Sequence, residues 1–182
     1  MDGPFYVDTR APHISADVAS VTLAATAKAI IPIANIPVFG ANYFSYIGKA
    51  VRISLLGRIT TVATPGNGTF SIYWGNGTDA NGTLIVSSGA ATLLANQTSL
   101  SWKVVVLVRC RALGATGSLM AGGSITYNSA VVAANEIMIP ASVPAATTCD
   151  LTVANVLSPQ YLRSGSTAES IQVHDVLYEA LN

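Results

Sequence analysis

Hydrophobic and polar residues alternate most regularly between Trp102 and Leu113. One set of alternate positions is apolar throughout, and the other begins apolar and ends with basic residues. Successive side chains of a β-strand point to opposite faces of its sheet, and β-branched residues suit such a surface. The segment therefore predicts a long strand with one buried face, formed by Trp102, Val104, Val106, Val108, Cys110 and Ala112.

Two further segments show a similar alternation. In residues 50–62, the apolar side chains share one face, with Leu56 as the exception on the other face. Gly57 within this run indicates a bulge or the close approach of another backbone. In residues 169–181, the apolar positions change phase after Val173, which predicts a bulge near His174 and Asp175. Shorter strands are predicted in residues 21–33, 69–74, 83–86, 90–94, 118–127, 137–139 and 147–153.

Segments rich in glycine, asparagine and proline separate these strands. Asn67 and Gly68 end a turn-forming run and are typical of a tight hairpin, and residues 75–82 form a longer loop. Residues 35–46 predict a loop anchored by Val38, Phe39, Tyr43 and Phe44; we expect it to pack on the strands, with ligand binding as the alternative. Residues 158–165 are predicted to be a loop that carries Arg163.

About eight strands without a convincing helix predict an all-β protein, an antiparallel two-sheet β-sandwich that is jelly-roll-like. An immunoglobulin-type sandwich is the alternative, disfavoured because Trp102 precedes both cysteines, whose separation is also wrong. Residues 21–182 are expected to form this single domain. Residues 1–20 have little periodicity and predict an extended N-terminal arm, either docked on a neighbour or frayed.

The composition is unusual for a soluble domain. Charged residues make up 10% of the chain, against roughly 25% in typical domains, and nine basic residues balance nine acidic ones. Because so little charge gives little repulsion between copies, we expect a subunit that buries surface in an assembly; a monomer with a neutral surface is the alternative. The lack of a basic excess disfavours nucleic-acid binding.

Neither membrane insertion nor secretion is predicted. No apolar run reaches the roughly 18 to 20 residues that cross a bilayer, and the N-terminus does not resemble a signal peptide. We therefore expect synthesis in a cytosol, where Cys110 and Cys149 would be buried free thiols.

No arrangement of residues predicts catalysis, a cofactor or a metal. His174 and Asp175 are neighbours on a strand, so they point to opposite faces and cannot form an orienting pair without the bulge. Asp79 alone supplies too few carboxylates for a calcium loop, and the histidines and cysteines lack the close spacing of a zinc site. We expect a protein that is not an enzyme and has no cofactor.

Charge placement is more informative. Residues 49–111 carry six basic side chains and only Asp79 as an acid, whereas most other acids lie in the arm and the last strand. A neighbour's acidic arm or edge could complement a basic face; alternatively, the charges are solvated and paired within the subunit. The candidate assembly contacts are Phe5, Tyr6, Arg10, Arg52, Arg58, Arg109, Arg111 and Asp175.

Several short stretches resemble structural proteins of tailed bacteriophages: residues 48–59, 102–104, 119–123 and 170–182. The resemblance covers roughly residues 20–182. It implies a jelly-roll virion component without enzymatic activity, most often a capsid decoration or cement subunit. Such a subunit would form a homotrimer, contact the major capsid protein or a neighbouring virion protein, and reside in the virion after assembly in the host cytoplasm.

A second function remains open. The chain could be a tail or head-fibre module that binds a receptor or carbohydrate, with Tyr43, Tyr73 and Trp74 as stacking surfaces. Exposed aromatic rings in a concave region would favour this function, whereas buried rings would favour the structural one.

Overall fold

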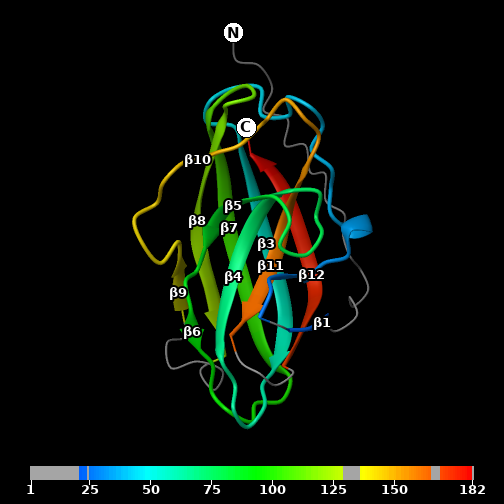
Figure 1. Cartoon of the computed structure of the whole chain (residues 1–182), viewed down its shortest axis with the longest axis vertical. Coiled ribbons are helices and arrows are strands. Elements are labelled where there is room, and N and C mark those ends of the chain that lie inside the picture. Colours follow the sequence, from blue (N-terminus) through cyan, green and yellow to red (C-terminus); the bar gives the residue numbers. More distant parts are fainter. Residues whose placement is uncertain (1–20, 24, 129–135, 165–168, 182) are drawn as a thin grey trace.

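The protein is a sandwich of two antiparallel sheets (Figure 1). The computed structural model describes residues 21–23, 25–128, 136–164 and 169–181. The larger sheet contains β1 (Val21–Thr22), β3 (Ala50–Thr60), β7 (Leu100–Ala112), β8 (Ser118–Tyr127), β9 (Glu136–Ile139), β10 (Thr147–Thr148) and β12 (Ser170–Leu181). The smaller sheet contains β2 (Lys28–Ala29), β4 (Asn67–Gly75), β5 (Thr83–Ser87), β6 (Ala91–Thr92) and β11 (Val156–Arg163). The one helical element in these residues is a 3₁₀ turn, η1 (Ile33–Asn35).

The strand order is that of a jelly roll. In the larger sheet β12 lies between β1 and β3, followed by β7 and β8, and the smaller sheet runs β2, β11, β4, β5. The antiparallel pairs β1·β12, β2·β11, β3·β7 and β4·β5 are nested, as in one long hairpin that has been wrapped into two sheets. Strands β8, β9 and β10 widen the larger sheet beyond β7.

Alternation of side chains accounts for the long strands. On β7, Trp102, Val104, Val106 and Val108 are at most 1% exposed, whereas Lys103 and Arg109 face solvent. The same holds for β3, whose inward residues are buried and whose arginines are exposed. The predicted β-sandwich, and the face assigned to each residue of these two strands, are confirmed.

Buried tyrosines join the two sheets by hydrogen bonds. The hydroxyl oxygens of Tyr127 on β8 and Tyr161 on β11 are 2.7 Å apart, and Tyr178 on β12 donates to the carbonyl of Leu157 on β11 at 2.8 Å. Each bond satisfies a hydroxyl that would otherwise be buried without a partner. The tyrosines thus fill the core and fix how the sheets lie against each other.

Several predicted elements were wrong. Residues 158–163 are part of strand β11, not a loop, and pair with β4 along their length. Asn67 and Gly68 begin β4 and form no hairpin, because β3 and β4 belong to different sheets. The predicted strand of residues 147–153 is limited to β10, while the described part of residues 21–33 contains a first strand, β1, and a second short strand, β2. The predicted arm, residues 1–20, lies outside the described residues.

The predicted bulge in the last strand is confirmed. The pairing of β12 with β3 shifts between Val173 and Asp175, so that Val173 and Val176 both face the core. Beside it, Gly57 on β3 lies against the backbone of β12 and the indole ring of Trp102. A side chain at this position would overlap the carbonyl oxygen of Gln172, which explains the glycine.

Substituting Gly57 tests this close approach. We expect Gly57→Ala to lower the free energy of unfolding by about 1–3 kcal/mol, because the β12 backbone or the Trp102 ring must move. Gly122→Ala is the matched control, since the nearest atom to its added carbon is 3.6 Å away, an ordinary contact. Urea unfolding measures both, and equal effects would contradict the proposed packing.

Candidate functional site

The outer face of the larger sheet brings together those candidate contact residues that the structure describes. Cross-strand pairing aligns residues from five strands in one row, which we call the central row: Leu177, Ser54, Val105, Ser124 and Met138. Val105 is 42% exposed and Met138 is 64% exposed. The serine side chains are short, so the larger apolar side chains of the row project above them from the outer face.

Charged groups lie on both sides of the central row. One neighbouring row holds the exposed Leu56 among charged side chains and consists of Asp175, Leu56, Lys103, Thr126 and Glu136. The row on the other side consists of Glu179, Arg52, Leu107 and Gly122. An apolar centre with a polar rim is the usual anatomy of a protein–protein interface.

Two of the predicted contact residues bind within the subunit. Arg52 Nη1 lies 3.0 Å from Glu179 Oε2, and Arg58 Nε donates to Gln172 Oε1 at 2.9 Å. Both partners are on β12, directly across from the arginines. The exposed ion pair of Arg52 with Glu179 is typically worth at most about 1 kcal/mol, so it positions the side chains more than it stabilises the fold.

The remaining basic residues of this face are available to a partner. Lys103, Arg109 and Arg111 on β7 are exposed, and none forms an ion pair with another residue in the described part of the chain. Asp175 is exposed on the same face and lies across from Leu56 in the pairing of β12 with β3. Phe5, Tyr6 and Arg10 lie outside the described residues.

The three candidate stacking residues do not form one surface. Tyr73 and Trp74 are consecutive on β4 and point to opposite faces, and Trp74 is buried with its Nε1 donating to the carbonyl of Asp150 at 2.8 Å. Tyr43 is half-buried in the loop, edge-on to Phe39 with ring centroids 4.9 Å apart, and Lys49 Nζ lies 4.0 Å from its ring centroid. The loop packs through Phe39 and Phe44 as expected, but Val38 is exposed.

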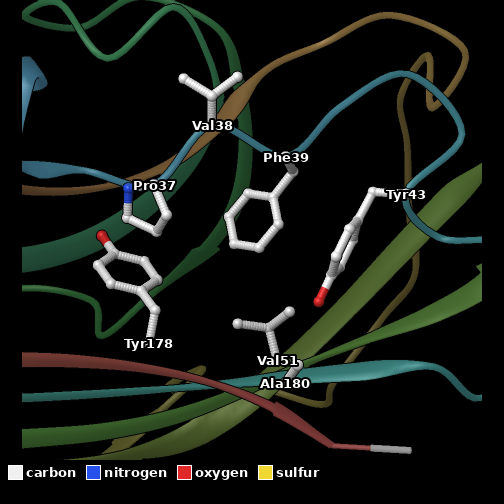
Figure 2. A pocket seen from close by; sticks show the side chains of 7 residues that line it. All are labelled: Pro37, Val38, Phe39, Tyr43, Val51, Tyr178 and Ala180. Carbon is white, nitrogen blue, oxygen red and sulfur yellow. The ribbon is translucent and has the colours of Figure 1, made fainter. Parts of the chain in front are cut away.

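A narrow apolar pocket lies between this loop and the larger sheet (Figure 2). Phe39 and Tyr43 approach it from the loop, while Tyr178 and Val51 rise from β12 and β3. It is completed by Pro37, Val38 and Ala180. The hydroxyl of Tyr178 is bonded to the carbonyl of Leu157 on the other sheet.

The loop of residues 75–82 is attached to β2 through Asp79. Asp79 accepts hydrogen bonds from Lys28 Nζ and the backbone N–H of Ala29, both at 2.8 Å. Partial burial raises the pKa of Asp79, but these bonds outweigh it, and the pKa falls below its usual value. Among the described residues, no three His, Cys, Asp or Glu side chains come together as a metal site requires.

A buried ion pair joins the ends of β11 and β12, and sequence reasoning missed it. Arg163 Nε lies 2.6 Å from Glu169 Oε2, and their side chains are 5% and 0% exposed. Burial raises the pKa of Glu169, and the guanidinium of Arg163 partly opposes this effect. Glu169 is therefore not one of the acids available to a basic face on another subunit.

Cys110 and Cys149 are buried free thiols near the end of β7. Burial raises the pKa of Cys110, and it raises the pKa of Cys149 to about 11. The proximity of Cys110 adds to the effect on Cys149, while a backbone hydrogen bond from Leu119 reduces it. Neither thiol has the lowered pKa and exposure of a catalytic nucleophile.

The Cys149 thiol predicts a loss of stability at alkaline pH. The native state holds its proton up to about pH 11, whereas an unfolded thiol loses it near about pH 8.5. The contribution of this thiol to the free energy of unfolding is therefore complete below about pH 8.5 and is lost as the pH rises through 11. Urea unfolding between pH 7 and pH 10.5 measures the free energy of unfolding, which should fall less steeply with pH for Cys149→Ala than for the unmodified protein. Identical pH dependence of the two proteins would contradict this.

Comparison with known proteins adds no relative. No protein-family model matches the chain, and no curated protein is significantly similar to it. In the part of the chain that the structure describes, no helix is long and apolar enough to cross a membrane.

Proposed function

We propose that this chain is a non-enzymatic structural subunit of a virus particle, a decoration or cement protein on the capsid of a tailed bacteriophage. The phage resemblance of residues 20–182 suggests the class of particle. The outer face of the larger sheet supports a role in assembly, because its centre is apolar and its rim is charged.

The central row is the observation that carries the proposal. Val105 and Met138 are exposed on a broad sheet face, with Leu56 in the next row, in a chain whose charged fraction is only 10%. A contiguous apolar surface rimmed by polar residues marks an interaction site in soluble proteins. We assign this face to contacts between copies of the chain, which form a homotrimer.

Charge fixes the register of the assembly. Lys103 lies in the row next to the central row, and Arg109 and Arg111 lie further along β7 on the same face. None of the three has an ion pair with described residues, so they would meet acidic groups of a neighbouring copy or of the major capsid protein. Residues 1–20 contain three aspartates and one arginine, so a neighbour's arm has the complementary charge.

The receptor-binding alternative has less support. Its stacking residues are buried or half-buried, and Tyr73 and Trp74 lie on opposite faces of β4. A carbohydrate platform needs neighbouring exposed rings on one face, which these three residues do not provide.

A charge placed in the central row tests the assembly face. We expect Val105→Glu to shift the dissociation of the oligomer to at least tenfold higher protein concentration, because a carboxylate would be buried in an apolar contact. Leu84→Glu is the matched control, since Leu84 is 43% exposed on β5 of the other sheet. Analytical ultracentrifugation measures both variants, and equal weakening would contradict the assignment.

The virion role has its own test. Peptide mass spectrometry and immunogold labelling of gradient-purified particles from the virus that encodes this chain should find it on the capsid surface in many copies. Absence from purified particles would overturn the proposed function, whatever the oligomeric state of the isolated protein.

A further inference from the structure

Three loops meet at one end of the sandwich, which we call the tip. The tip consists of residues 37–49, 112–117 and 149–155. The N–H of Asn42 donates to the carbonyl of Leu151 at 3.0 Å, and the N–H of Leu151 donates to the carbonyl of Gly114 at 3.2 Å. The N–H of Gly48 donates to the carbonyl of Cys110, near the end of β7, at 2.9 Å. These bonds hold the three loops together at the upper end of the view in Figure 1.

Each loop of the tip exposes large apolar side chains. The exposed apolar residues of the tip are Val38, Tyr46, Ile47, Leu113 and Val153. Ile47 is 65% exposed at the corner of a β-turn, in which the N–H of Lys49 donates to the carbonyl of Tyr46 at 3.3 Å. Leu113 precedes the turn from β7 to β8, and Val153 lies in the segment before β11. Turns usually carry Gly, Pro, Asn, Asp or Ser, so large apolar side chains here indicate binding more than folding.

Positive charge lies beside these apolar residues. Arg109 and Arg111 are exposed at the end of β7 that leads into the second loop, and neither forms an ion pair with another residue in the described part of the chain. Lys49 in the first loop adds a third positive charge. Asp150 is the only acidic residue in the three loops, all of which the structure describes, and its carboxylate accepts hydrogen bonds from Thr152. The tip therefore attracts an anionic partner.

We propose that the tip binds the surface of an anionic lipid bilayer. Its apolar side chains enter the boundary between head groups and acyl chains, while Arg109 and Arg111 meet lipid phosphates. Tyr46 suits this boundary because its ring is apolar and its hydroxyl is polar. The apolar side chains project from separate turns, and a fluid bilayer surrounds each of them, whereas a protein partner would need a matching shape for every one.

The tip is already ordered for such a contact. Its loops are joined by backbone hydrogen bonds, and Phe39 and Phe44 of the first loop are buried. Binding therefore immobilises few additional groups, which lowers its entropic cost. Membrane attachment does not depend on the capsid role, in which the same arginines would meet protein carboxylates, so the two are tested separately.

Co-sedimentation of the full chain with vesicles tests this contact. One set of vesicles is phosphatidylcholine alone, and the other contains roughly 30% phosphatidylglycerol to supply negative charge. We expect binding to the anionic vesicles that weakens as salt is added. Ile47→Asp should lower the partition coefficient at least about tenfold, because a carboxylate replaces an inserted apolar side chain, and Leu113→Asp in a different loop should do the same. Arg111→Gln should lower it about fivefold, because one phosphate contact is lost.

Two matched variants serve as controls. Val143→Asp adds the same charge as Ile47→Asp at a residue that is 86% exposed between β9 and β10, outside the tip. Lys103→Gln removes one positive charge near the other end of β7. Both should bind the anionic vesicles as the unmodified protein does.

The outcomes are distinct. Binding to the anionic vesicles that falls in the tip variants but not in the controls supports the proposal. Binding to neither set of vesicles, equal binding to both sets, or equal loss in tip and control variants would overturn it. If the tip variants lower the amount of the chain on purified virus particles while no vesicle is bound, the partner of the tip is a protein, which also overturns the proposal.

Discussion

The structure depends on the dry interface between its two sheets. The inward residues of β7 and β3 are almost completely buried in the core between the sheets, and three tyrosines cross this interface with their hydroxyls bonded. Burying a large aliphatic or aromatic side chain contributes about 1.5–3 kcal/mol, so this interface supplies most of the favourable energy of folding. It also determines which side chains face outward, and therefore the composition of the outer face of the larger sheet.

The strands with one solvent-exposed face could be predicted from the sequence, whereas the strand that is buried on both faces could not. In β7 and β3, apolar and polar residues alternate because only one face of each strand is buried. In β12, the change of phase of the apolar positions correctly predicted the bulge. The sequence predicts a loop over residues 158–165, yet Ser158, Pro159 and Gln160 are buried within strand β11. Gln160 is satisfied from outside the sheet by the backbone of Thr78 and Ala80, contacts between distant segments that no local pattern contains.

The same distinction holds for the candidate site. Period-2 alternation correctly placed the basic residues of β3 and β7 on the outer face, but their partners follow from the register of β12, which the bulge shifts. Arg52 therefore meets Glu179, while Asp175 lies across from Leu56. Tyr73 and Trp74 are consecutive on β4 and therefore point to opposite faces, so they cannot form the predicted stacking surface.

The claim that this fold serves assembly is tested most directly by the mass of the intact protein in solution. Light scattering on the size-exclusion peak should give three times the chain mass of 18.7 kDa, with dissociation only on dilution. A mass of 18.7 kDa at every concentration would mean that the outer face of the larger sheet does not bind a second copy, and it would contradict the homotrimer.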